Sequence, residues 1–147
     1  MLYFSYGSNM DEARMKDRNC KFTDAKPAIL ENWKLVFNKQ SQKNPSVGFG
    51  NIEPEKGSVV EGVLYTISDD MIISLDKYEG HPKHYTRKKM NVKCDGTIVE
   101  ADVYIANRNW VKDGLKPTRE YLEHFLAEKN FLTESYCENL KKMCYIS

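Results

Sequence analysis

The chain has 147 residues, with 22 Lys and Arg against 21 Asp and Glu, so its formal net charge is +1. This length predicts a single domain over residues 1–147, and a composition of 41% hydrophobic and 29% charged residues excludes a disordered or fibrous chain. The near-neutral charge argues against a nucleic-acid binder, which concentrates Lys and Arg on one face. No apolar run approaches the ~20 residues that cross a bilayer, and the start lacks the basic region of a signal peptide. We therefore expect a cytoplasmic protein that does not bind membranes.

The first third of the chain alternates short apolar stretches with turn residues. Residues 2–5 predict a buried strand, a Gly-Ser-Asn turn follows, and residues 11–18 predict a helix with Ser8 or Asn9 as its N-cap. Two extended stretches, 28–30 and 33–37, come next. Between 38 and 56, Pro and Gly leave one short strand at 49–52 in an irregular region, either a mobile lid or an ordinary surface excursion.

The remaining two-thirds gives clearer patterns. Residues 59–67 predict a strand, and 69–79 predict a helix that Ser68 caps and Gly80 ends. Strands at 85–93 and 97–105 flank Asp95-Gly96, a strong hairpin signal. Two helices, starting near Thr118 and Thr133, close the chain. This order indicates an α+β fold with a mostly antiparallel or mixed sheet, such as a small barrel.

The four cysteines are expected to be small buried side chains in a reducing compartment. Cys20, Cys94, Cys137 and Cys144 form no Cys-x-x-Cys motif, and no histidine is spaced with them as a zinc site. The sequence therefore predicts no metal site.

The turn Tyr6-Gly7-Ser8-Asn9 is the first candidate for a binding site. A strand, a glycine turn and a helix start follow one another within nine residues, so free N–H groups at Gly7–Asn9 and the positive end of the helix dipole favour an anion or an oxyanion. Most turns of this kind are only well-capped turns, and no Gly-Lys-Ser/Thr follows that would make a Walker A loop.

Glu79 is the second candidate. It falls in the last turn of the helix predicted at 69–79, on the apolar stripe that faces the core, and both burial and the helix dipole raise the pKa of a carboxyl there. Such a group suits a general base that acts on an ammonium group. The alternative is a solvated acid paired with Lys83 or Arg87, while Asp76 is expected to pair with the adjacent lysine or to cap a loop.

A Ser–His site is a weaker candidate. Ser8 would be the nucleophile with His81 or His84, but the chain has no Gly-x-Ser-x-Gly elbow and specifies no orienting acid.

Several motifs, taken in order and spacing, resemble one known family. They are Tyr3-Phe4-Ser5-Tyr6-Gly7-Ser8-Asn9-Met10, Asn51-Ile52-Glu53-Pro54 with Gly57, Gly62-Val63-Leu64-Tyr65, Leu75-Asp76 with Glu79-Gly80 and Tyr85, and Pro117-Thr118-Arg119-Glu120-Tyr121. Together they resemble the gamma-glutamylcyclotransferase superfamily, including its AIG2-like branch. The resemblance implies a six- or seven-stranded mixed β-barrel flanked by helices. It also implies an enzyme that converts a γ-glutamyl amino acid or amine to 5-oxoproline and the free amine.

The same resemblance implies roles for particular residues. Glu79 matches the catalytic acid/base, and Tyr121 matches a tyrosine that contacts substrate. The substrate-binding loop corresponds to Tyr3, Phe4, Ser5, Tyr6, Gly7, Ser8 and Asn9. Because the attacking amine belongs to the substrate, the family chemistry needs no cofactor and no metal, and the expected partner is a small γ-glutamyl compound bound by a monomer or homodimer. Two other functions stay open: a non-catalytic module that binds a small anion at Gly7–Asn9, and a Ser8-dependent hydrolase or acyl transferase.

Overall fold

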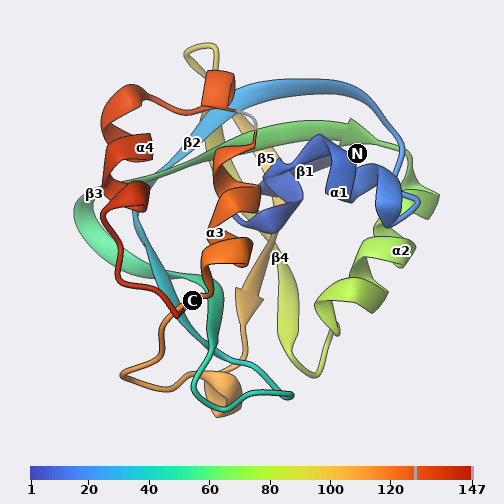
Figure 1. Ribbon diagram of the computed structural model, residues 1–147. Coiled ribbons are helices and arrows are strands. Elements are labelled where there is room, and N and C mark those ends of the chain that lie inside the picture. Colours follow the sequence, from blue (N-terminus) through green and yellow to red (C-terminus); the bar gives the residue numbers. More distant parts are fainter. Residues whose placement is uncertain (128, 147) are drawn as a thin grey trace.

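Five strands close into a barrel in the computed structural model, which describes residues 1–127 and 129–146. The strands are β1 (Leu2–Ser5), β2 (Phe22–Gln40), β3 (Gly48–Ile67), β4 (Tyr85–Cys94) and β5 (Thr97–Ala106). Their order around the barrel is β1-β3-β2-β4-β5, and all neighbours are antiparallel except β1 and β5, which are parallel (Figure 1). The expected mixed barrel is thus confirmed, but the expected count of six or seven strands is wrong.

The strand count differs because β2 and β3 are bent strands of 19 and 20 residues. The stretches 28–30 and 33–37 belong to β2, and 49–52 and 59–67 belong to β3. The bend carries Asn32 (φ 67°) and Gly57 (φ 86°), and the Gly57 N–H donates to Asn32 Oδ1 at 3.1 Å. A β-bulge bends a strand without ending its ladder, so turn residues here mark bends and not strand ends.

The region from 38 to 56 is consequently much more regular than the sequence indicates. Only residues 41–47 lie between β2 and β3, so the expected irregular region shrinks to this short loop. Pro54 pairs with Trp33 beside a register shift, a position where its missing N–H costs little.

In the described residues, four α-helices and three short 3₁₀ turns accompany the barrel. The helices are α1 (Glu12–Asp17), α2 (Asp69–Glu79), α3 (Arg119–Leu126) and α4 (Glu134–Lys141), and the 3₁₀ turns are η1 (Ser8–Met10), η2 (Arg108–Trp110) and η3 (Lys129–Phe131). None of the helices in the described ranges is long and apolar enough to cross a bilayer.

Most of the expected helix ends are confirmed. Gly80 ends α2 in the left-handed conformation (φ 65°), and the Thr118 and Thr133 side chains cap α3 and α4. The cap expected for α1 is wrong: the Asp11 side chain accepts from the Ala13 N–H at 3.0 Å, because residues 8–10 form the separate turn η1.

The tight turn between β4 and β5 is also confirmed. Asp95 and Gly96 have φ values of 52° and 75°, the two positive angles of a type I′ hairpin.

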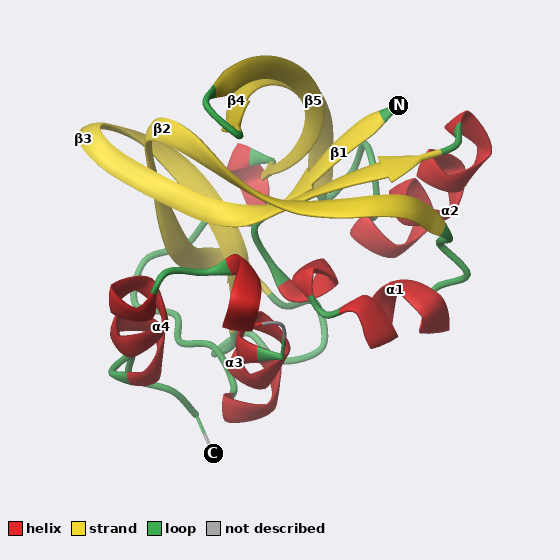
Figure 2. Ribbon diagram, turned by 90° about the horizontal axis from the view of Figure 1, so that it is seen from above, coloured by secondary structure: helices red, strands yellow, loops and turns green. Residues whose placement is uncertain are grey.

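The core has two parts, on the two faces of the barrel wall. Phe4, Leu30, Ile52 and Val103 belong to a cluster drawn from all five strands, which fills the barrel. The second cluster joins the outer strand faces to the helices, and Figure 2 shows α1, α3 and α4 on one side of the long β2–β3 ribbon with the β4–β5 hairpin on the other. Because side chains alternate along a strand, β1 sends residues to both clusters.

The cysteines follow their expected environment with one exception. All four thiols are free, and Cys20, Cys94 and Cys137 are buried. The prediction is wrong for Cys144, which is exposed after α4 has ended.

Candidate active site

A pocket of about 450 Å³ opens at one rim of the barrel. The ends of β1, β2 and β5 meet the starts of β3 and β4 there, because neighbouring antiparallel strands run in opposite directions. All nine residues that the sequence singles out for the site line this one pocket: Tyr3, Phe4, Ser5, Tyr6, Gly7, Ser8, Asn9, Glu79 and Tyr121. The last turn of α2 and the first turn of α3 bring the final two.

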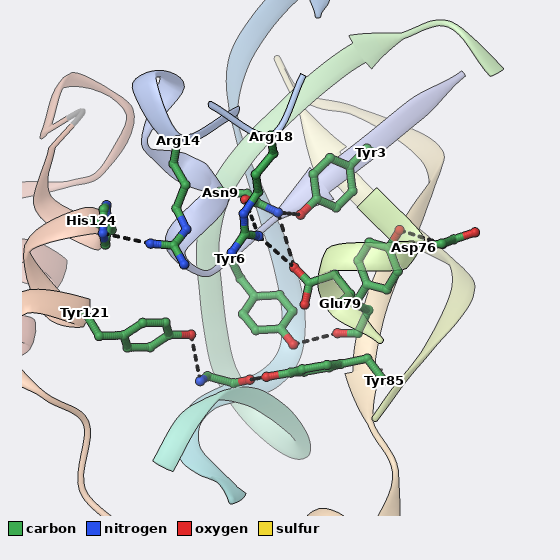
Figure 3. A network of polar contacts seen from close by, with 12 residues as sticks. Tyr3, Tyr6, Asn9, Arg14, Arg18, Asp76, Glu79, Tyr85, Tyr121 and His124 are labelled. Atoms are coloured by element: carbon green, nitrogen blue, oxygen red, sulfur yellow. Dashed lines mark hydrogen bonds and ion pairs between the residues drawn. The ribbon is translucent and has the colours of Figure 1, made fainter. Parts of the chain in front are cut away.

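Glu79 is held at the pocket by the burial of its helix. The α2 residues Ile72 and Leu75 are buried, and Glu79 follows on the same stripe at the helix end. Its carboxylate accepts from Asn9 Nδ2 at 3.2 Å and lies 3.8 Å from the Arg18 guanidinium, with 18% of the side chain exposed (Figure 3). The alternative of a solvated acid paired with Lys83 or Arg87 is therefore wrong.

The charge of Glu79 is set by opposing effects. Burial raises the pKa of its carboxyl, and the nearby cations Arg18, Arg14 and Lys39 lower it. Burial is the larger effect, so the pKa of Glu79 lies above its ordinary value. A carboxyl with a raised pKa is a stronger proton acceptor than an ordinary glutamate carboxyl, and it can give the proton up again.

Asn9 connects the Gly7–Asn9 turn to Glu79. Its amide nitrogen donates both to Glu79 and to the Tyr3 hydroxyl at 3.0 Å, and its amide oxygen accepts from Arg18 at 3.0 Å. The Tyr65 hydroxyl donates to its carbonyl at 2.7 Å. With only 2% of its surface exposed, Asn9 fixes the turn and the carboxylate relative to each other.

Tyrosine hydroxyls form much of the remaining wall. Tyr6 donates to the Tyr104 carbonyl at 2.5 Å, and Tyr85 donates to the Gly50 carbonyl at 2.7 Å. The Tyr121 hydroxyl accepts from the Gly50 N–H at 2.9 Å, which ties α3 to β3 (Figure 3). Burial raises the pKa of Tyr6, Tyr85 and Tyr121, so these groups stay neutral hydroxyls at physiological pH.

Sequence patterns missed the cations of the pocket. Arg14 lies on α1 and Arg18 is the C-cap residue of this helix, so the two are four residues apart and share a face, a signal that was available. Arg14 is held by His124 at 2.8 Å (Figure 3). His124 in turn contacts Asp11 at 2.8 Å. No sequence pattern indicates that Lys39 belongs to the site, because its position at the barrel rim depends on β2 continuing to Gln40.

Across residues 1–127 and 129–146, no three His, Cys, Asp or Glu side chains come together as a metal-binding group.

Comparison with known proteins identifies the family. The family model described as Gamma-glutamyl cyclotransferase, AIG2-like, matches residues 3–125. A gamma-glutamylcyclotransferase from Bos taurus is 34% identical over 82 residues, which are 54% of this chain and 44% of that protein. The chain spans less than half the length of the curated relatives that it matches.

Solved structures agree with this match. A gamma-glutamyl cyclotransferase superposes with a TM-score of 0.85 at 25% identity, covering 100% of this chain and 89% of the other. An uncharacterized protein from Homo sapiens gives a TM-score of 0.85 at 26% identity, covering 99% and 89%. With the family model matched across the whole pocket-forming region, the chain belongs to the gamma-glutamyl cyclotransferase, AIG2-like family.

Proposed function

We propose that this protein is a γ-glutamylcyclotransferase, which converts a γ-glutamyl amino acid or amine to 5-oxoproline and the free amine. The observation that carries the proposal is the buried Glu79 carboxyl, with its raised pKa, hydrogen-bonded to the Gly7–Asn9 turn. A base of this kind beside a cluster of free N–H groups suits a substrate that carries an ammonium and a carboxylate on the same carbon.

The reaction begins with proton transfer. The N–H groups of Gly7–Asn9 bind the substrate's α-carboxylate or the developing oxyanion, and Glu79 takes a proton from the α-ammonium. The freed amine attacks the γ-carbonyl carbon of the same molecule and closes a five-membered ring. The bond from that carbon to the leaving nitrogen then breaks as Glu79 returns its proton to the departing amine. The ring nitrogen gives up its second proton through the same carboxylate to the departing amine, which leaves a neutral lactam.

The pocket contributes mainly by positioning. A γ-glutamyl chain is flexible, so holding its amine against its own γ-carbonyl removes most of the entropic barrier to ring closure. The neutral hydroxyls of Tyr6, Tyr85 and Tyr121 are tied to backbone groups, which keeps the pocket wall rigid. A rigid wall of this kind favours one bent substrate conformation.

The alternative of a Ser8-dependent hydrolase has less support. Within the part of the chain that the structure describes, no hydrogen bond joins Ser8 to a histidine. His81 Nδ1 accepts from the Arg87 N–H at 3.2 Å, and His84 Nδ1 faces Lys39 at 2.8 Å. Both candidate bases are engaged away from the serine.

The test is 5-oxoproline release from a panel of γ-glutamyl amino acids and amines. We expect turnover by the wild type and a fall of roughly 10²- to 10⁴-fold in Glu79→Gln, because the proton transfers lose their catalyst. Glu123→Gln is the matched control, since Glu123 is an exposed acid on α3, and it should keep full activity. Activity that persists in a folded Glu79→Gln protein would refute the mechanism, and binding without turnover would favour the non-catalytic module.

A further inference from the structure

One wall of the pocket has no role in the proposed reaction. Lys39 from the end of β2, Phe49 from the start of β3 and His84 before β4 form it, with the loop 41–47 at its edge. This wall lies in the same pocket as Glu79, and Lys39 is near enough to lower the pKa of the Glu79 carboxyl.

Lys39 is a buried cation within reach of the pocket. Only 4% of its surface is exposed, and among the described residues no carboxylate lies within ion-pair distance of its ammonium group. Burying a charge without a counter-ion is costly, and burial accordingly lowers the pKa of Lys39. A cost of this kind is usual where a ligand supplies the missing charge.

Neutral groups hold the Lys39 side chain in place. Its Nζ lies 2.8 Å from His84 Nδ1, 4.5 Å from the centre of the Trp110 ring and 5.8 Å from that of Phe49. An ammonium group only donates, so His84 Nδ1 accepts, and burial together with Lys39 and Lys83 lowers the pKa of His84 and favours this neutral ring. His84 also stacks on Trp110 with ring centres 4.2 Å apart. The ammonium is therefore oriented but not neutralised, and it has donors left for a ligand.

The charge of the whole pocket also favours an anionic ligand. Its lining contains one acid, Glu79, and five cationic side chains: Arg14, Arg18, Lys39, Lys43 and Lys77. The α-carboxylate of a γ-glutamyl group compensates its own ammonium, so that group alone leaves the cationic excess unmatched. A substrate with a second carboxylate on its leaving group adds a negative charge that compensates part of this cationic excess.

We propose that Lys39 is a specificity-determining residue whose ammonium binds a carboxylate on the leaving amine, so that the site selects γ-glutamyl α-amino acids over γ-glutamylamines. This inference rests on the proposed cyclotransferase function and names the substrate class of the same site. His84 is a positioning residue in this arrangement, because it orients the ammonium without contacting substrate.

The test compares two substrates that differ only in the carboxylate, γ-glutamyl-L-alanine and γ-glutamylethylamine. We expect the wild-type kcat/KM to favour the alanine compound by roughly 10- to 100-fold, the usual effect of a hydrogen bond to a charged group. In Lys39→Met this ratio should approach one, and Lys39→Arg, which keeps the charge, should retain most of it. Lys34→Met removes a more exposed lysine from the same strand outside the pocket and should leave the ratio unchanged.

The outcomes separate this inference from the proposed function. A wild-type ratio near one, or a ratio that persists in folded Lys39→Met and Lys39→Gln proteins, would overturn the role of Lys39 while leaving the cyclotransferase reaction intact. If the wild type releases no 5-oxoproline, the role of Lys39 is tested by calorimetry, which measures the binding of the same two compounds. Binding that depends on the carboxylate and is lost in Lys39→Met supports the Lys39 site without the reaction, whereas equal or absent binding refutes it.

Discussion

At the scale of single residues, the position and the pKa of the Glu79 carboxyl depend on neighbours that lie far from it in sequence. Asn9 donates a hydrogen bond to the carboxylate, and Arg18 approaches it to 3.8 Å while also donating to Asn9. The charge of Arg18 lowers the pKa of Glu79, and burial, which is the larger effect, raises it. The pKa of Glu79 should therefore respond to substitutions at these neighbouring residues.

The acid limb of the pH–activity profile tests this dependence. A base works as the carboxylate, so kcat/KM should fall as pH drops through the pKa of Glu79, at a higher pH than an ordinary glutamate with a pKa of 4.5 would give. Arg18→Met removes the largest effect that lowers this pKa, so the limb should move to still higher pH. Arg119→Met, which removes an exposed arginine on α3, should leave the limb in place. A limb that moves to lower pH in Arg18→Met would contradict the assignment of Glu79 as the base.

At the scale of elements, local signals predicted what local interactions determine. Gly80 ends α2 and Asp95-Gly96 turns the β4–β5 hairpin, because each positive φ depends on the residue itself. The bends of β2 and β3 could not be predicted, since a bulge at Asn32 and Gly57 exists only relative to a paired strand. For this reason the strand number was overestimated.

The same distinction applies to the candidate site. The chain segment around the Gly7–Asn9 turn and the apolar stripe ending at Glu79 are local patterns, so the sequence singled them out. No sequence pattern indicates Lys39 as a site residue, because only the long β2–β3 pairing places it at the rim of the barrel. Asp76 was expected to pair with the adjacent lysine or to cap a loop, which is wrong: it binds Arg87 and the Tyr104 hydroxyl, partners that strands β4 and β5 bring together.

Close packing of β1 on β3 gives a prediction at this scale. A Cβ on Gly62 would lie 2.2 Å from the Ser5 carbonyl oxygen and 2.8 Å from the Phe4 ring, so Gly62→Ala must displace β1. We expect a loss of about 1–3 kcal/mol in the free energy of unfolding, measured by urea denaturation. Gly7→Ala is the matched comparison, because its Cβ meets only ordinary contacts at 3.8 Å from Phe125 and Tyr121. It should change stability by less than ~0.5 kcal/mol and lower 5-oxoproline release, and equal stability losses in the two variants would contradict the packing argument.

At the scale of the whole molecule, an ion-pair network joins the helix that carries Glu79 to the barrel wall. Arg87 on β4 contacts Asp76 on α2 at 3.0 Å and Asp102 on β5 at 3.3 Å, and Lys89 reaches the same Asp102 at 3.0 Å. Asp102 is 2% exposed and pairs with Tyr3 where β1 closes the barrel against β5. Since Asp76 lies one turn before Glu79, the Arg87 guanidinium links the closure of the barrel to the position of the Glu79 carboxyl.

Replacing that guanidinium should affect stability and activity together. Arg87→Met leaves the buried Asp102 with Lys89 alone and frees Asp76 from β4, so we expect a loss of about 2–3 kcal/mol in the free energy of unfolding. Without its tie to β4, α2 should place Glu79 less accurately, and kcat should fall by about tenfold or more in protein that is still folded. Lys89→Met is the control, because this lysine is 57% exposed and its removal should cost less than ~1 kcal/mol without lowering kcat. Urea denaturation and 5-oxoproline release measured on both variants distinguish the two cases. An Arg87→Met protein that is destabilised but fully active would show that α2 is positioned by its apolar stripe, with the ion pairs serving the barrel alone.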